Sequence, residues 1–291
     1  MALEAEHVLG VRNELGEGPV WHGGEGALYW TDIPKNRLHR FDPATLEHRV
    51  LEANQHVGAF AFRASGEMVL AAEHGFALWQ PGAGEPRPFG VVKSGTAPIG
   101  FNDGAVDPAG RFWAGTLSNA DDNGLYRLEP DGSIYETDRG FGVPNGIGWS
   151  PDARTMYFTD SDAATIYAYD FEPETGQITN RRVWADSSDR PGVPDGLTVD
   201  VEGCVWSARW GGGCVERYSP EGRVLGTVTV AAAYPTSVAF GGADLNELYI
   251  TSALLEVPQE ARALNPLDGD LFRYRSSTQG LEQPLFGLPG R

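Results

Sequence analysis

Four oxygen-bearing side chains stand directly before a glycine and an apolar stretch: Glu17, Asp103, Asn145 and Asp195. They are roughly forty to ninety residues apart, which suits one position in successive copies of a repeat. In a closed repeat, three carboxylates and an amide would then face one another, which is unfavourable unless a cation lies between them. An all-oxygen donor set suits Ca²⁺, Mg²⁺, Mn²⁺ or Fe²⁺ better than a thiolate-and-imidazole zinc site does.

The same four phrases also have an ordinary structural interpretation. Asp or Asn before Gly is common in turns, where the side chain bonds nearby backbone and the glycine takes a positive φ. One such phrase alone favours a turn. Four phrases at one position of a repeat, one of them with a glutamate, favour the cation site.

A repeat of short strands must position these residues. Clear units begin at Gly18, Asp103, Asn145 and Asp195, and weaker copies begin near Gly58 and Thr236. Each unit of about 40 to 50 residues carries four strand-like segments, which is typical of a β-propeller blade. The sequence therefore predicts an all-β fold, a six-bladed β-propeller with four antiparallel strands per blade, as a single domain over residues 1–291.

Two details of this propeller can be predicted. We call the position of Glu17, Asp103, Asn145 and Asp195 in the repeat the ring position, and the side chains there the ring. The repeat alignment places Val57 and Thr236 at this position in the two weaker blades, so the ring combines polar and apolar side chains. Closing the circle of blades requires one blade to take a strand from the other end of the chain, because an open blade would leave a pairing edge exposed. Segments 3–9 and 284–288 are the candidates for that seam.

Composition excludes several functional classes. The formal net charge of -18 opposes nucleic-acid binding, which depends on clustered Lys and Arg. The sequence has neither a basic-then-apolar leader nor an apolar run of roughly 18 to 20 residues, so we expect a cytoplasmic protein without a membrane partner. A monomer is the default for such a propeller. Cys204 and Cys214 could pair across one hairpin, but a reduced pair is the preferred interpretation.

Several phrases together resemble one known family. They are LGEGPVW, FNDGAVDPAGRFWAGT, PNGIGWSPD, MYFTDS, PDGLTVDVEGCVW and WGGGCVERYSPEG, in the expected order over nearly the whole chain. They are similar to the senescence marker protein, gluconolactonase and luciferin-regenerating enzyme family. The resemblance implies a six-bladed propeller with one divalent cation at the channel mouth and, in most members, hydrolysis of a sugar lactone.

The resemblance also implies roles for particular residues. Glu17, Asn145 and Asp195 match the metal ligands of the family. Asn102 matches a residue close to the metal that also contacts substrate, whereas the repeat alone selects its neighbour Asp103. Adjacent strand residues point to opposite sides, so only one of this pair is expected to face the metal, and the resemblance favours Asn102.

Two positions depart from the family pattern. Gly100 and Ala120 stand where sugar-acid lactonases of the animal type carry an arginine and a glutamate. Recognition of substrate hydroxyl groups must therefore differ. The candidates for ligand contact on this chain are Asn102, Asp121, Asp122, Asn123, Trp149 and Trp210.

The predicted enzyme is a divalent-metal-dependent lactonase that acts on a small sugar-acid lactone, of the gluconolactonase, xylonolactonase or arabinonolactonase kind. A cation, with Ca²⁺, Mn²⁺, Mg²⁺, Fe²⁺ and Zn²⁺ all open, would polarise the lactone carbonyl and activate water. Asp195 is the first candidate for the general base and Asp103 is the second.

Two other functions stay open at this point. Organophosphate, phosphotriester or other ester hydrolysis could use the same metal site, because the fold does not choose the substrate. The phrase LYWTDIPKNRLHRFD, Leu28–Asp42, resembles the YWTD repeat of non-catalytic binding propellers. A serine hydrolase is disfavoured, since no G-x-S-x-G phrase occurs and all six histidines lie between His7 and His74, where structural or surface roles are expected.

Overall fold

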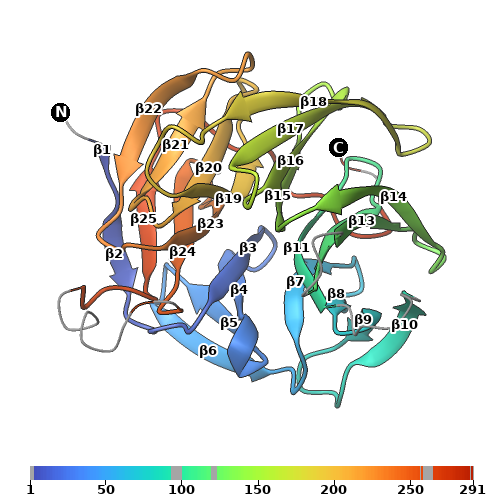
Figure 1. Cartoon of the computed structure of the whole chain (residues 1–291). Helices are drawn as coiled ribbons and strands as arrows, with labels where there is room; N and C mark the ends of the chain where they lie inside the picture. Colours follow the sequence, from blue (N-terminus) through green and yellow to red (C-terminus); the bar gives the residue numbers. More distant parts are fainter. Residues whose placement is uncertain are drawn as a thin grey trace.

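The chain folds almost entirely into short β-strands. The computed structural model describes residues 3–92, 100–118, 123–255, 257, 265–288 and 290. The strands form six antiparallel sheets, and the innermost strands β3, β7, β11, β15, β19 and β23 surround the centre of the molecule (Figure 1). The six-bladed β-propeller predicted from the sequence is confirmed.

The first three blades follow the chain from the centre outward. Blade one comprises β3 (Gly16–His22), β4 (Ala27–Asp32), β5 (Arg37–Asp42) and β6 (Glu47–Glu52), with the 3-10 helix η1 (Ile33–Lys35) between β4 and β5. Blade two comprises β7 (Val57–Phe62), β8 (Met68–Ala72), β9 (Gly75–Trp79) and β10 (Arg87–Val91). Blade three comprises β11 (Gly100–Val106), β12 (Phe112–Leu117), β13 (Asn123–Leu128) and β14 (Ile134–Phe141).

The last three blades continue the same order. Blade four comprises β15 (Pro144–Trp149), β16 (Thr155–Asp160), β17 (Thr165–Glu172) and β18 (Gln177–Asp186). Blade five comprises β19 (Val193–Val199), β20 (Val205–Trp210), β21 (Cys214–Tyr218) and β22 (Val224–Thr229). Blade six comprises β23 (Pro235–Gly241), β24 (Glu247–Ser252) and β25 (Leu271–Arg275), and its fourth strand is β2 (Glu6–Leu9). Among the described residues, no helix is long and apolar enough to cross a membrane.

The N-terminal segment closes the circle of blades, as predicted. Strand β2 pairs antiparallel with β25, and β1 (Leu3–Glu4) adds to the outer edge of blade five in parallel with β22. Figure 1 shows these blue strands beside the orange and red strands of the last two blades. The first and last parts of the chain therefore share blade six, which leaves no open edge at the seam.

The tail near residues 284–288 differs from the expectation, because it supplies no blade strand. Phe286 makes an isolated parallel bridge with Arg63, and its backbone N–H donates to the Phe62 carbonyl at 2.8 Å. Its ring is buried in the hydrophobic cluster that blades two and three share. Since Phe62 ends β7, the tail covers the face of the propeller where the innermost strands end.

We call the opposite face, where the innermost strands begin, the entry face. Strand β15 runs along the central channel from the entry face to the opposite face. Asn145 therefore lies near the entry face, and Trp149 lies at the other end of the strand. The Trp149 ring packs 6.2 Å from that of Trp113 and 5.8 Å from that of Phe171, between blades three and four. The prediction that Trp149 is available to a ligand at the mouth is therefore wrong.

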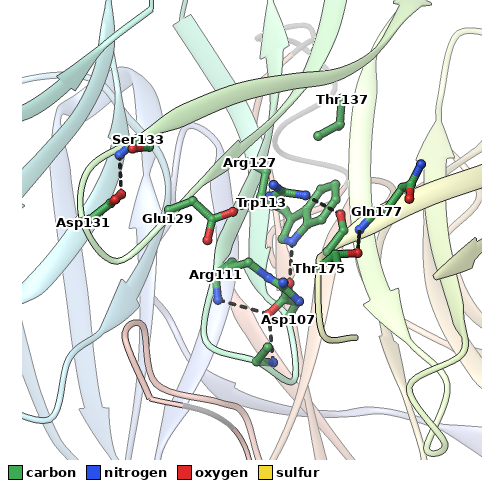
Figure 2. Close-up of polar contacts among 12 residues, drawn as sticks. Asp107, Arg111, Trp113, Arg127, Glu129, Asp131, Ser133, Thr137, Thr175 and Gln177 are labelled. Carbon is green, nitrogen blue, oxygen red and sulfur yellow. Dashed lines mark hydrogen bonds and ion pairs between the residues drawn. The ribbon is translucent and has the colours of Figure 1, made fainter. Parts of the chain in front are cut away.

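A buried Asp–Arg pair fastens blade three to blade four (Figure 2). Asp107 accepts hydrogen bonds from Arg111 Nε at 2.6 Å and from Trp113 Nε1 at 2.9 Å. Arg111 also donates to the Pro173 carbonyl at 2.6 Å, in the turn between β17 and β18. The pair thus joins the corner after β11 to the neighbouring blade.

We expect Asp107→Asn to lower the free energy of unfolding by about 3 to 5 kcal/mol, because it leaves the buried Arg111 guanidinium uncompensated. Urea denaturation measures this change. Asp131→Asn is the matched control, since the exposed Asp131 carboxylate accepts from the Ser133 N–H, as an amide oxygen also would. We expect the control to change stability by less than about 0.5 kcal/mol. Equal losses in the two variants would contradict the role assigned to the buried pair.

Candidate metal centre

Every innermost strand has a break in its register near the entry face. In β15, Pro144 pairs with Asp160 and Ile147 pairs with Phe158, so that Asn145 and Gly146 together oppose one residue. Corresponding irregularities occur in β3, β7, β11, β19 and β23. Such bulges interrupt the strict alternation of a strand and re-aim its side chains.

The registers identify the residue of each blade at the position of Asn145. Gly16 pairs with Asp32 as Pro144 pairs with Asp160, and this makes Glu17 the equivalent of Asn145. In blade order, the ring position is occupied by Glu17, Gly58, Asn102, Asn145, Asp195 and Thr236. The prediction of Val57 for blade two is wrong by one residue, because the irregularity in β7 falls at Gly58.

Both residues of the Asn102–Asp103 pair reach the ring, in contrast to the expectation from strict alternation. Asn102 occupies the ring position, and its Nδ2 donates to the Pro144 carbonyl of the next blade at 2.9 Å. Asp103 lies close enough to raise the pKa of both Glu17 and Asp195. The bulge in β11 explains how two successive side chains approach one site.

Three buried carboxylates make the ring strongly acidic. Glu17, Asp103 and Asp195 are 5%, 7% and 4% exposed. Burial raises the pKa of Asp103 to about 6 and holds the pKa of Asp195 and Glu17 well above their ordinary values, with neighbouring carboxylates adding to the rise. Each carboxylate accepts a hydrogen bond from the backbone N–H of the glycine that follows it, as from Gly104, 2.7 Å from Asp103 Oδ1.

Two oxygens of the ring lack hydrogen-bond partners in the part of the chain that the structure describes. They are Asn145 Oδ1 and Asp195 Oδ1, and both are buried. A buried acceptor without a partner costs free energy unless a donor or a cation satisfies it. Oxygen acceptors beside three carboxylates fit a hard cation, so the donor set agrees with a divalent cation held by Glu17, Asn145 and Asp195.

The glycines after the ring residues are required by close approach of the next blade. A Cβ on Gly146 would lie 2.6 Å from the Leu197 backbone N, and one on Gly196 would lie 2.0 Å from Ser237 Oγ. Neither glycine has a positive φ. The turn interpretation of these two phrases therefore does not hold, because the glycines allow neighbouring innermost strands to touch.

The structure separates the candidates for substrate contact. Trp210 ends β20 on the entry face and is partly exposed, and its ring centroid lies 4.9 Å from that of Tyr234 in the loop between β22 and β23. Asn123 differs from the expectation: it is 2% exposed, its Oδ1 accepts from Ser118, and its Nδ2 donates to the Gly142 carbonyl. Its amide is thus engaged in holding loops. Asp121, Asp122 and Ala120 lie outside the described residues.

Sequence reasoning missed His56 as a residue of the mouth. Its Nε2 lies 2.7 Å from the Phe101 carbonyl, directly before Asn102. A Cβ on Gly100 would lie 3.4 Å from the same nitrogen, so the imidazole stands beside the position where the family pattern has an arginine. His56 directly precedes β7, where Val143 directly precedes β15, so the repeat gave no signal for a polar residue at this position.

A second acidic cluster, Asp200, Glu202 and Cys204, has its ligand atoms within 4.8 Å of one another. The Arg217 guanidinium donates to Asp200 Oδ2 and Glu202 Oε2, both at 2.7 Å, while Asp200 Oδ1 accepts from the Cys204 N–H. This corner repeats the arrangement around Asp107 in blade three, and the Arg217 guanidinium balances one of its two carboxylate charges. We assign it a structural role.

The two cysteines are free thiols at opposite ends of the β20–β21 hairpin. Cys204 precedes β20, whereas Cys214 begins β21 opposite Arg209. About five residues of strand, roughly 16 Å, separate these ends. They cannot form the disulfide that the sequence left open without movement of the backbone.

Comparison with known proteins places this geometry in a family. Residues 15–254 match the family model described as SMP-30/Gluconolactonase/LRE-like region. The chain is 41% identical to pentonolactonase XacC of Haloferax volcanii over 86% of each chain. It is 38% identical to 6-deoxy-6-sulfogluconolactonase of Pseudomonas putida over 94% of each.

Solved structures agree with these sequence matches. A calcium-binding protein, regucalcin, from Agrobacterium tumefaciens superposes with a TM-score of 0.94 at 27% identity, covering 99% of each chain. Luciferin-regenerating enzyme superposes with a TM-score of 0.86 at 28% identity, covering 94% of this chain and 95% of that one. The chain therefore belongs to the SMP-30/gluconolactonase/LRE-like family.

Proposed function

We propose that this protein is a divalent-cation-dependent hydrolase that opens a small sugar lactone. The observation that carries the proposal is a pair of buried oxygens, Asn145 Oδ1 and Asp195 Oδ1, that have no hydrogen-bond partner among the described residues and lie beside three carboxylates. The similarity to pentonolactonase and 6-deoxy-6-sulfogluconolactonase supports a sugar lactone as the substrate class. We keep Glu17, Asn145 and Asp195 as the residues that would hold the cation.

When bound, the cation supplies a Lewis acid that polarises the lactone carbonyl and lowers the pKa of nearby water. The carboxylates of the ring handle the proton. Asp195 or Asp103 accepts a proton from water as the water oxygen bonds to the carbonyl carbon of the lactone. The same group returns the proton to the ester oxygen within the lactone cycle when the bond between this oxygen and the carbonyl carbon breaks. Without a cation, burial raises the pKa of Asp103 to about 6, and a bound cation would lower that pKa and keep the carboxylate ionised to accept a proton.

Other residues of the entry face would bind and orient the sugar. Asn102 lies at the ring position of blade three, and the aromatic pair of Trp210 and Tyr234 borders blades five and six. Partly exposed aromatic faces suit the apolar face of a sugar ring, while amides suit its hydroxyl groups. Asp121 stays a prediction from the sequence, as do the monomeric state and the cytoplasmic location.

The YWTD-like phrase has a structural explanation in blade one. Trp30 Nε1 donates to Asn13 Oδ1, Thr31 Oγ1 donates to the Val57 carbonyl at 2.8 Å, and Asp32 accepts from the Leu15 N–H. These side chains hold the first blade to its neighbours. No observation on this phrase therefore favours a binding propeller over an enzyme.

We expect chelation to abolish hydrolysis and an added divalent cation to restore it. The test measures hydrolysis of pentono- and hexonolactones by pH-stat, before and after EDTA treatment and dialysis, and after addition of Ca²⁺, Mg²⁺, Mn²⁺ or Zn²⁺. A phosphotriester in the same panel tests the alternative substrate class, and we expect its kcat/KM to be lower. Full lactonase activity in the metal-stripped protein would refute the proposal.

A further inference from the structure

Side chains of one blade donate hydrogen bonds to the carbonyl that precedes the ring residue of the next blade. The innermost strands have a sheet partner on one side only, so these carbonyls need other donors. The five bonds run from Thr31 to Val57, His56 to Phe101, Asn102 to Pro144, Ser161 to Pro194 and Thr236 to Gly16. They link the ring positions around the entry face.

Ser161 also contacts a ring residue of its own blade. It follows β16, is buried, and its Oγ lies 2.6 Å from the Pro194 carbonyl and 3.0 Å from Asn145 Nδ2. A carbonyl can only accept a hydrogen bond, so the hydroxyl proton of Ser161 points to Pro194. The Ser161 oxygen must then accept from the Asn145 NH₂ group.

This pattern of donors fixes the orientation of the Asn145 amide. Its NH₂ end is held by Ser161, so its Oδ1 is directed away from Ser161 and stays buried without a partner in the described structure. If Ser161 lost its hydroxyl, the amide could rotate and donate to the neighbouring carboxylates. In the rotated state, the NH₂ group would donate hydrogen bonds to the carboxylates of the cation-free ring. The cation would then have to displace these hydrogen bonds before it could bind.

We propose that Ser161 is a positioning residue that selects the amide oxygen of Asn145, rather than its NH₂ group, for the cation. This inference rests on the proposed function, because it requires a cation at the ring. It adds a residue outside the three proposed ligands, whose effect on the cation passes entirely through the amide of Asn145.

The test is a double-mutant cycle on cation affinity, measured by isothermal titration calorimetry with metal-stripped protein. Ca²⁺, Mg²⁺, Mn²⁺, Zn²⁺ and, under anaerobic conditions, Fe²⁺ are each titrated, and the ion that binds the wild type most tightly is used for the variants. We expect Ser161→Ala to weaken its binding by about 10- to 100-fold, as is usual for residues that orient a ligand. In the Asn145→Asp background the same change should cost less than about threefold, because the two oxygens of a carboxylate are equivalent ligands.

Ser187→Ala is the matched control. Ser187 is also buried, also belongs to blade four, and donates to the Ala164 carbonyl at 2.9 Å, but has no bond to Asn145. We expect this variant to bind the cation as the wild type does. Thermal unfolding of each cation-free protein checks that the variants are folded. If Ser161→Ala does not fold, Ser161→Cys keeps the approximate shape with a much weaker hydrogen-bonding group and should also lose affinity.

Two results would overturn the inference, and they differ in meaning. Equal losses from Ser161→Ala in the Asn145 and Asn145→Asp backgrounds, or full affinity in Ser161→Cys, would show that the hydroxyl does not act through the amide. Wild-type protein that binds none of the five ions would instead overturn the proposed function, and the inference would fall with it.

Discussion

Replacing Asp195 with asparagine is expected to lower kcat/KM for lactone hydrolysis by about 10²- to 10⁴-fold at saturating cation, the range for loss of a general base. The change keeps the shape of the side chain and one oxygen, but removes the negative charge and the basic site. It also leaves an NH₂ group beside Glu17 and Asp103, where oxygen donors are needed. Cation affinity should therefore fall as well, and calorimetry separates the two effects.

The comparison with Asp103→Asn assigns the base. If Asp195 is the base, Asp103→Asn should cost no more than about tenfold at saturating cation, below the range for a lost base. Asp162→Asn is the control, because this exposed carboxylate also lies on the entry face, in the loop after β16. Its kcat/KM should stay within about twofold of the wild type. Full recovery of Asp195→Asn at saturating cation would contradict a role in proton transfer and leave Asp195 as a ligand only.

Carboxylates alternate with neutral residues around the channel mouth. Its carboxylates come from blades one, three and five, at Glu17, Asp103 and Asp195, so the three charges approach the centre from alternate blades. The intervening positions are neutral: Gly58 cannot carry a side chain, since a Cβ there would lie 2.1 Å from the Phe101 carbonyl. A six-fold scaffold thus presents a three-fold set of negative charges, which spreads their repulsion before a cation binds.

Much of the fold could be predicted because its repeat is visible in the sequence. The strand and turn pattern recurs six times, and the alternating segment 3–9 lies where the seam requires a strand. The tail could not be predicted in the same way, since Phe286 packs between blades by shape and does not extend a strand. Trp149 was misplaced because the direction of β15 puts the two ends of that strand on opposite faces.

The ring gave a strong sequence signal because two constraints act on adjacent residues. The oxygen-bearing side chain converges on the centre, and the glycine after it lets the next innermost strand approach, as at Gly146 and Gly196. The residues that donate hydrogen bonds to the carbonyls preceding the ring residues gave no such signal. Ser161 and His56 serve equivalent carbonyls from non-equivalent positions, so no alignment of the blades could have related them.

Without a cation, the ring should make the protein less stable as the pH rises. Burial raises the pKa of Asp103 from 3.8 to about 6, and the pKa values of Glu17 and Asp195 are also raised. The folded state then binds more protons than the unfolded state between these values, so the contribution of these groups is fully present below about pH 4. It is lost as the pH rises through the folded-state pKa values.

Asp103→Asn isolates one part of this effect. We expect cation-free Asp103→Asn to become more stable than cation-free wild type as the pH rises from about 4 to 7, by up to roughly 3 kcal/mol, the free energy of a two-unit shift in pKa. The amide keeps the oxygen that accepts from Gly104 and carries no charge at any of these pH values. Urea denaturation at several pH values in EDTA measures the difference, and Asp189→Asn, at an exposed carboxylate, is the control.

Saturating cation should remove most of this advantage. A bound ion stabilises both proteins through Glu17, Asn145 and Asp195. In the wild type it also compensates the charge of the Asp103 carboxylate, which Asp103→Asn lacks. Asp103→Asn should therefore exceed the wild type in stability only when the cation is absent, and its lead should shrink as the cation is added. A lead that is independent of pH, or that grows as the pH falls, would show that the Asp103 carboxylate is not held at a raised pKa in the ring.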